Sequence, residues 1–253
     1  MSSLENKVAI VTGGTSGIGR ATSLELARAG ARVAVIGRDS QRVQATLAEL
    51  NAQCDSDTHI GLSLDVRIES DMSAMAERVH AAYGRIDILV NSAGSGGTLA
   101  AQRRLPFAVV QTPLSEWEEV IDTNLKGVFL ATHAVLPILI HQGGGEILNV
   151  SSSRGATKGL PYAAAYSSSK RALMGLTESL AEEMLEYGIR VHAILPDVTE
   201  TRMLHVTGDI APQGLMSPDD VARFIVRLVS LPEDLVLVDT LLAPFRIGEG
   251  AAA

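Results

Sequence analysis

The chain has 253 residues, of which 46% are hydrophobic and 20% are charged. This composition is typical of a globular protein and excludes a disordered or fibrous one. The formal net charge of −8 disfavours nucleic acid or an anionic membrane as the main partner, because both attract positively charged proteins.

The sequence also bears on the compartment and on metal binding. The single cysteine, Cys54, excludes an intramolecular disulfide and fits a reducing compartment. The start of the chain lacks a signal-peptide pattern, and the apolar stretch 128–140 is too short and too interrupted for a membrane span. His133 and His141 share a predicted helix without a third ligand. We therefore expect a soluble cytoplasmic protein with no metal site and no membrane or nucleic-acid partner.

Short runs rich in β-branched residues alternate with longer helical patterns along the whole chain. Strands are predicted at 7–11, 32–36, 58–64, 86–90, 146–150, 189–195 and 235–239, and helices near 18–29, 40–53, 69–83, 115–141, 163–187 and 217–230. Apolar strands separated by helices indicate a parallel sheet covered on both faces. We predict an α/β fold in which residues 1–253 form one doubly wound parallel sheet of the Rossmann type, with substrate loops near 94–112 and 197–217.

A glycine-rich segment, TGGTSGIG at 12–19, follows the first predicted strand and precedes a helix. Glycines there allow a sharp turn and a close approach of backbone to a ligand, and the helix directs its N–H groups to the same place. This arrangement suits a pyrophosphate, although the spacing G-xxx-G-x-G differs from the commoner G-x-G-x-x-G. The alternative is a tight strand-to-helix turn without a ligand.

The end of the second predicted strand bears on the choice between NAD and NADP. An acidic residue at that position would hold the ribose hydroxyls of NAD. The sequence has Gly37 there, followed by Arg38, whose guanidinium could bind a 2′-phosphate in bidentate geometry. This favours NADP. The alternative is a solvated Arg38 beside an Asp39 that caps the next helix.

Tyr166 and Lys170 are four residues apart in a helical pattern, so they share one face of the helix. An ammonium group beside a phenol favours the phenolate and is expected to lower the pKa of the tyrosine, which makes it a general acid/base. Serines 151–153 directly follow the fifth predicted strand, where a hydroxyl could donate to a developing alkoxide. The alternatives are a surface Tyr–Lys pair and a polar loop.

Five motifs occur in order: TGGTSGIG, NSAG at 91–94, DTNLKG around Asn124, NVSSSRG around Ser152, and YSSSK at 166–170. Together they resemble the short-chain dehydrogenase/reductase family over about residues 5–203 and the helix at 217–230. The resemblance implies that Tyr166 exchanges the proton and that Lys170 lowers its pKa and binds the nicotinamide ribose. It also implies that Asn124 holds a water linking Lys170 to solvent, the alternative being a locally bonded buried polar residue.

The resemblance leaves two candidates for the serine beside Tyr166. The family spacing from Tyr166 points to Ser153, whereas the pattern S-S-x-x-G ending at Gly155 points to Ser152, which we prefer. The residue after Pro196 is usually glycine in the family, and here it is Asp197. Aspartate is less tolerant of unusual backbone conformations, and its charge could repel anionic substrates.

The cofactor contacts that the resemblance implies come from several loops. They are Asp65 and Val66 near the adenine, Asn91, Ala93 and Gly94 on the adenine-ribose side, and Tyr166, Lys170, Pro196, Val198 and Thr201 near the nicotinamide. They add to the contacts expected from the glycine segment, at Gly13, Thr15, Ser16, Gly17, Ile18 and Gly19, and to Arg38 at the 2′-phosphate. For Asp65 the alternative is a helix N-cap.

These observations predict an NADP(H)-dependent oxidoreductase acting on a small-molecule ketone, aldehyde or secondary alcohol. The alternatives are the same chemistry with NAD(H), a dinucleotide-binding sensor without turnover, and a lyase or epimerase on this fold. The helices at 115–141 and 163–187 have more apolar surface than sheet coverage needs, and in the family the matching helices pair between subunits. A homodimer or homotetramer is therefore expected.

Overall fold

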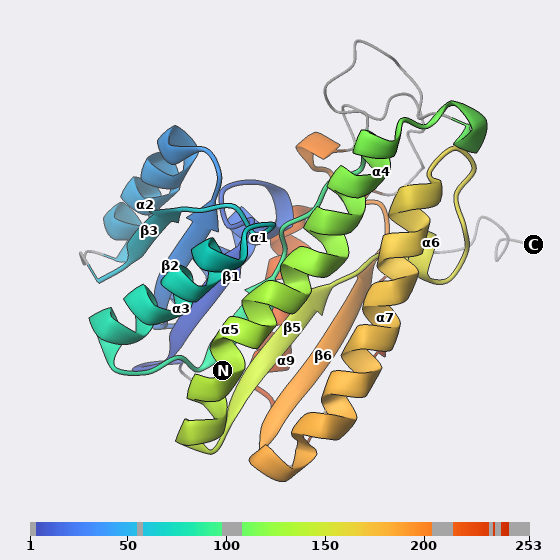
Figure 1. Cartoon of the computed structure of the whole chain (residues 1–253). Helices are drawn as coiled ribbons and strands as arrows, with labels where there is room; N and C mark the ends of the chain where they lie inside the picture. The colour runs from blue at the N-terminus through green and yellow to red at the C-terminus, as the bar shows by residue number, and fades with distance from the viewer. Residues whose placement is uncertain are drawn as a thin grey trace, which may run out of the picture.

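A seven-stranded parallel sheet forms the centre of the molecule in the computed structural model, which describes residues 4–54, 58–97, 108–203, 215–232, 235 and 239–242 (Figure 1). The strands are β1 (Val8–Thr12), β2 (Arg32–Gly37), β3 (Ile60–Ser63), β4 (Ile88–Asn91), β5 (Gly145–Val150), β6 (Ile189–Pro196) and β7 (Asp239–Leu242). Their order is β3-β2-β1-β4-β5-β6-β7, and all neighbouring strands run parallel. The order reverses between β1 and β4, and ligands of open parallel sheets bind in the crevice at such a point.

Helices cover both faces of this sheet (Figure 1). They are α1 (Gly17–Arg28), α2 (Ser40–Cys54), α3 (Glu69–Tyr83), α4 (Leu114–Ile121), α5 (Gly127–Gln142), α6 (Ser153–Ala156), α7 (Ala164–Met184) and α9 (Pro218–Val229), with short 3₁₀ turns η1 (Val109–Gln111) and η3 (Leu185–Tyr187). Helices α3, α5 and α7 pack on one face, and α1, α2 and α9 pack on the other. The doubly wound fold expected from the sequence is confirmed.

The strands are apolar on both faces because each face is covered. Alternate residues of one strand enter different hydrophobic clusters: Ile10 of β1 packs with α3, α5 and α7, whereas its neighbour Val11 packs with α1, α2 and α9. Both side chains are fully buried. The near-continuous apolar runs in the sequence therefore have a direct structural cause.

The last described strand spans Asp239–Leu242, where it pairs with Ala193–Pro196 of β6. It meets the predicted strand 235–239 at Asp239, and residues 236–238 of that prediction lie outside the described residues. One predicted helix differs from the structure. The predicted helix at 115–141 is divided into α4 and α5 by a π-helical segment, η2 (Asp122–Lys126). Residues 98–107 and 204–214, within the two expected substrate loops, lie outside the described residues.

The helical stretch Leu114–Gln142 is long and apolar enough to cross a membrane by length and composition alone. Half of its most apolar window is buried inside the protein, and α5 contributes Leu130, Val135 and Leu139 to the core beneath the sheet. Its apolar character therefore has an explanation as a core helix of the domain. The sequence-based expectation of a buried helix agrees with this packing.

Candidate active site

The glycine segment forms a tight turn between β1 and α1 whose backbone has no room for side chains. A Cβ atom on Gly19 would lie 2.3 Å from the carbonyl oxygen of Gly13, and one on Gly13, where φ is +66°, would lie 2.7 Å from the backbone of Ala93. Gly17 also has a positive φ, and a Cβ there would approach Thr201 to 3.0 Å. The glycines thus bring the ends of β1 and β4 and the segment after β6 together.

The N-terminus of α1 is open to a ligand. Ser16 occupies the N-cap position, but its side chain makes no capping hydrogen bond, and the first turn of the helix contains no acidic residue. The first N–H groups of the helix and its positive dipole end are therefore available to an anion. Together with the glycine backbone, this fits the pyrophosphate of a dinucleotide. Ile18 follows in the first turn and packs against the core cluster of α1 and α9.

Gly37, the last residue of β2, is packed closely against another side chain. A Cβ on Gly37 would lie 2.7 Å from the side chain of Thr15. The next residue, Arg38, is exposed, whereas Asp39 accepts hydrogen bonds from the backbone N–H groups of Gln41 and Arg42 at 3.0 and 3.2 Å. Asp39 therefore caps α2, as the alternative reading of the sequence supposed, and the guanidinium of Arg38 remains at the surface beside the turn.

Asp65, after β3, is held by a neighbouring arginine. The guanidinium of Arg67 donates to both carboxylate oxygens at 2.6–3.0 Å, and the backbone N–H of Arg67 donates at 3.0 Å. Burial raises the pKa of Asp65, but the bonds and charge of Arg67 and the charge of Arg38 lower it overall. The N-cap of α3 is Ile68, so the N-cap reading of Asp65 is wrong. Val66 is buried beside it.

The predicted adenine-ribose residues at the end of β4 and just after it differ in their surroundings. The side-chain amide of Asn91 is buried and donates to Asn149 at 2.9 Å and to Thr132 at 3.3 Å, so it joins β4 to β5 rather than lining the crevice. Any cofactor contact from Asn91 would come from its backbone. Ala93 lies against the glycine turn, where its N–H donates to the hydroxyl of Thr12, and Gly94 is exposed.

Asn124 lies in the π-helical segment and is completely buried. Its side-chain oxygen accepts from the Ser95 backbone N–H at 2.7 Å, and its nitrogen donates to the Ser95 carbonyl at 2.9 Å and the Ser169 hydroxyl at 3.0 Å. These bonds tie the segment after β4 to α7, one residue before Lys170. The bond from Asn124 to α7 is made to Ser169, the residue before Lys170. The side chain of Asn124 therefore holds the segment after β4 and helix α7 in place.

Ser152 and Tyr166 are joined by a hydrogen bond between their side chains. Ser152 is the N-cap residue of α6, where it makes no capping bond, and Tyr166 is in the first turn of α7. The adjacent Ser153 points elsewhere and donates to the carboxylate of Asp197 at 3.1 Å. The structure therefore brings Ser152, rather than Ser153, to the tyrosine, which is the choice we preferred from the sequence.

Lys170 lies on the same face of α7 as Tyr166, with its Nζ 5.9 Å from the centre of the tyrosine ring. The lysine is buried, and its ammonium donates to the carbonyl of Val150 at the end of β5 at 2.8 Å. Burial lowers its pKa from 10.5 to about 8. A site that partly destabilises a charged lysine is typical of functional positions.

The expected lowering of the Tyr166 pKa is wrong for the protein without cofactor. The protein packed around the tyrosine raises its pKa above the ordinary value, and the hydrogen bond from Ser152 opposes this only in part. Desolvation of the phenolate by burial is therefore the dominant effect on this pKa. Tyr166 is therefore protonated near neutral pH and is able to donate a proton.

The segment after β6 completes one side of the crevice. Pro196 ends β6 and is buried, Val198 accepts a backbone bond from Met216 at 2.9 Å, and Thr201 packs against Gly17. A cleft of about 390 Å³ opens where Gly17, Thr201 and Pro218 of α9 meet. Thr201 is thus beside the helix N-terminus, and the predicted residues of this segment are gathered at one end of the sheet.

The structure adds residues that the sequence reasoning missed. Ser95 and Ser169 anchor Asn124, Arg67 pairs with Asp65, and Thr12 receives the backbone N–H groups of Ser92 and Ala93. All of them adjoin predicted motifs, but a single sequence gives no partner for a buried serine or threonine. No group of three or more potential metal ligands occurs within the described ranges.

Comparison with known proteins identifies the family. A family model described as "short chain dehydrogenase" matches residues 7–209. The chain belongs to the short-chain dehydrogenase/reductase family. This confirms the resemblance seen in the motifs and the expected enzyme class, an NAD(P)-dependent oxidoreductase.

Individual relatives cover nearly the whole length of this short-chain dehydrogenase/reductase. D-threitol dehydrogenase from Mycolicibacterium smegmatis is 35% identical over 90% of this chain and 87% of its own. A 3-ketoacyl-(acyl-carrier-protein) reductase from Brucella melitensis, solved with NADH, has a TM-score of 0.84, 30% identity, and coverage of 95% of this chain and 98% of its own. A metagenomic short-chain oxidoreductase solved with NADP has a TM-score of 0.81, 30% identity, and coverage of 97% and 100%. Both complexes are consistent with the nicotinamide cofactor expected from the sequence.

Proposed function

We propose that this protein is an NADP(H)-dependent oxidoreductase that interconverts a ketone or aldehyde and the corresponding alcohol. The observation that carries the proposal is the arrangement of Ser152, Tyr166 and Lys170 at the carboxyl ends of β5 and the start of α7. D-threitol dehydrogenase, a relative over most of the chain, is named for the oxidation of an alcohol. The segments 94–112 and 197–217 are the proposed substrate loops.

In this proposal the chain's residues hold the substrate oxygen and move its proton. When bound, the nicotinamide would supply or accept the hydride. Tyr166 would give a proton from its hydroxyl to the carbonyl oxygen in reduction and take it back in oxidation. Ser152, bonded to that hydroxyl, would donate to the same oxygen as negative charge develops on it. Lys170 would bind the nicotinamide ribose and favour the ionised tyrosine.

The open N-terminus of α1 and the glycine turn support a dinucleotide, and the end of β2 supports NADP. A side chain at Gly37 would meet the side chain of Thr15, which disfavours an acidic residue there. Arg38 is exposed, and the N-terminus of α2 is capped by Asp39. A 2′-phosphate has the negative charge and the pair of acceptor oxygens that a planar guanidinium binds in bidentate fashion.

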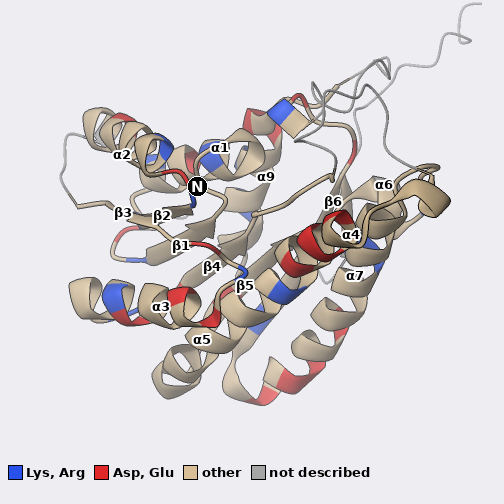
Figure 2. Cartoon of the chain, turned by 45° about the horizontal axis from the view of Figure 1, so that its top comes forward, with Lys and Arg blue, Asp and Glu red and all other residues tan. Residues whose placement is uncertain are grey.

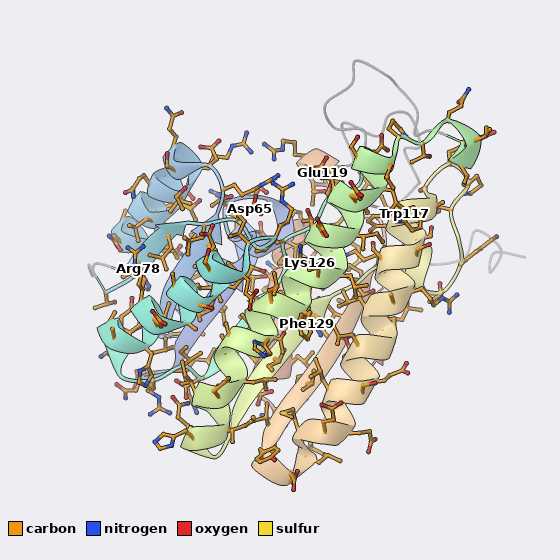
Figure 3. All side chains as sticks on the ribbon, in the orientation of Figure 1. Asp65, Arg78, Trp117, Glu119, Lys126 and Phe129 are labelled. Carbon is orange, nitrogen blue, oxygen red and sulfur yellow. The ribbon has the colours of Figure 1, made fainter. Side chains whose placement is uncertain are left out.

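Cofactor affinity tests this preference. Calorimetric titration with NADPH and NADH is compared for the wild type, Arg38→Ala and a control, Arg78→Ala, an exposed arginine of α3 labelled in Figure 3. Loss of a charge-assisted bond predicts a roughly 10- to 100-fold weaker NADPH affinity in Arg38→Ala, with NADH affinity unchanged. Equal losses for both cofactors, or no loss, would reject the role of Arg38.

We also propose that the protein is a homodimer or homotetramer and that it acts in the cytoplasm. Leu114, Trp117 and Phe129 of the α4–α5 stretch are 69%, 38% and 50% exposed, and the last two are labelled in Figure 3. Exposed large apolar side chains on one helical stretch are typical of a protein interface. Light scattering of the wild type and Phe129→Lys checks the assembly, which the charge is expected to weaken.

A further inference from the structure

The connection between α6 and α7 lies beside the proposed reaction centre. It joins the short helix that has Ser152 at its N-cap to the helix that has Tyr166 in its first turn, so it follows one of the two bonded hydroxyls and precedes the other. Figure 2 shows α4, α6 and α7 next to one another, and both α4 and α6 contact α7. The connection is fixed to α7, because the backbone N–H of Leu160 donates to the hydroxyl of Ser167 at 3.0 Å.

Tyr162, within this connection, has an unusual backbone conformation. Its φ is +62°, in the left-handed region that bulky side chains rarely adopt. Within the described ranges Asn6 is the one other non-glycine residue with a positive φ, and asparagine is among the residues that tolerate this region. A glycine at position 162 would adopt the same conformation without strain. The tyrosine is therefore held there at a cost in stability.

The side chain of Tyr162 is 60% exposed, so burial does not offset this cost. A buried tyrosine would stabilise the fold through the apolar surface that it removes from water, whereas most of this side chain remains accessible to water. Strained residues that persist beside a reaction centre are typical of functional positions. The ring of Tyr162 is therefore available to a ligand at the site.

The chain next to Tyr162 and the turn before α4 offer small or apolar side chains. Three alanines at 163–165 separate Tyr162 from Tyr166, so no long or charged side chain lies between the two tyrosines along the chain. Val109 and Val110 of η1, which ends two residues before α4, are 71% and 92% exposed and belong to the proposed substrate loop 94–112. These surroundings suit an uncharged, apolar group of a substrate.

We propose that Tyr162 is a specificity-determining residue that stacks on an aromatic ring attached to the reacting carbon of the substrate. The site would then favour aryl ketones and the corresponding benzylic alcohols over aliphatic compounds of the same size. Offset stacking of two rings contributes to binding beyond the apolar area that is buried, and a saturated ring of equal size gains the area alone. This inference rests on the proposed oxidoreductase function and names the substrate class of that site.

The test compares two ketones of similar size, acetophenone with a flat aromatic ring and cyclohexyl methyl ketone with a saturated one. Their binding to the protein saturated with NADPH is measured by the change in nicotinamide fluorescence, and kcat/KM is measured wherever turnover occurs. Tyr162→Gly removes the ring and the strain, and Tyr162→Phe retains the ring. The control is Tyr187→Ala, an exposed tyrosine that follows the far end of α7, about 30 Å from Tyr166.

The proposal predicts that the wild type, Tyr162→Phe and Tyr187→Ala bind acetophenone roughly 3- to 10-fold more tightly than cyclohexyl methyl ketone. In Tyr162→Gly this preference is lost, and the unfolding temperature is unchanged or higher, because the strain at position 162 is relieved.

A preference that Tyr162→Gly retains overturns the proposal, and so does a preference that Tyr162→Phe loses or a wild type that binds NADPH but neither ketone. A fall of more than about 3 °C in the unfolding temperature of Tyr162→Gly would assign the ring to the packing of the fold and would also overturn the proposal. Failure of the wild type to bind NADPH in the first step rejects the oxidoreductase function itself, and this inference with it.

Discussion

The side chain of Ser152 hydrogen-bonds to that of Tyr166, so two residues from different elements present their hydroxyls at one point. Ser152 reaches this point because it ends the connection from β5 and occupies the N-cap position of the short helix α6, and Tyr166 does so from the first turn of α7. Gly155 has a φ of +103°, and a Cβ there would lie 3.3 Å from the tyrosine ring. The glycine therefore keeps α6 close against Tyr166.

The two adjacent serines are expected to differ in their effect on turnover. Ser152→Ala removes a donor to the developing oxyanion, and we predict a loss of about 10²- to 10³-fold in kcat. Ser153→Ala removes only the bond to Asp197, and its loss should stay within about tenfold. Steady-state kinetics of both variants with one carbonyl substrate decides the question, and a larger loss in Ser153→Ala would contradict the assignment.

Replacing Lys170 should make the protein more stable near neutral pH. Its pKa falls from 10.5 to about 8 on folding, which corresponds to roughly 3 kcal/mol that opposes folding while the lysine is charged. Lys170→Met removes this cost and also loses the bond to Val150, worth about 1 kcal/mol. We predict a net gain of about 2 kcal/mol in the free energy of unfolding at pH 7.

The pH dependence of that difference follows from the direction of the shift. Between pH 8 and 10.5 the unfolded chain binds more protons than the folded one, so wild-type stability rises with pH relative to Lys170→Met. The advantage of the variant should shrink across this window and be constant below it. Urea denaturation at several pH values measures this, and an advantage that grows with pH would contradict the buried, partly neutralised lysine.

Two glycine-to-alanine changes should have opposite effects on stability. In Gly19→Ala the new Cβ would meet the Gly13 carbonyl oxygen at 2.3 Å, so the glycine turn must shift, at a cost of about 1–3 kcal/mol and at least tenfold in NADPH affinity. Gly175 lies within α7, and a Cβ there meets nothing within 4 Å. Gly175→Ala should therefore stabilise the protein by about 0.5–1 kcal/mol. Thermal unfolding and calorimetry check both, and an equal effect of the two changes would contradict the turn geometry.

Asn124→Ala should weaken the connection between the segment after β4 and α7. The variant leaves the buried N–H and carbonyl of Ser95 without their side-chain partner, which costs about 2–4 kcal/mol. Hydrogen exchange is expected to rise at Ser95 and around Ser169. Unchanged exchange at these positions would show that the side chain of Asn124 does not hold the two segments together.

The fold was predictable because the same sequence pattern, an apolar run followed by a helical pattern, recurs along the chain. Each strand from β1 to β6 is a short apolar run between helical patterns, and burial on both faces requires that pattern wherever the strand lies. The start of α3 at Glu69 and its end at Tyr83 agree with the sequence prediction. The end was predictable because Gly84, which has a φ of +74°, ends the helix. The described part of β7, Asp239–Leu242, lies mostly beyond the predicted range 235–239, because a single sequence does not show which residues pair with β6.

The site residues were predictable from motifs, but their bonds were not. The sequence placed Asn91 at the crevice, yet its side-chain nitrogen donates to Asn149 and Thr132 inside the sheet. The pKa of Tyr166 moves opposite to the expectation because desolvation depends on packing that spacing does not reveal. Likewise, the side chain of Asn124 in the π-helical segment bonds to Ser95 and Ser169, partners that lie far away in the sequence.

The central claim is that Tyr166 exchanges the proton of a carbonyl substrate in an NADPH-dependent reaction. The most direct test is single-turnover reduction of a panel of ketones and aldehydes by the protein saturated with NADPH, comparing the wild type with Tyr166→Phe. The account predicts turnover by the wild type and a loss of about 10²- to 10⁴-fold in the variant, with NADPH affinity within threefold of the wild type. A variant that retains turnover within tenfold, or a wild type that binds NADPH and reduces none of the panel, would contradict it.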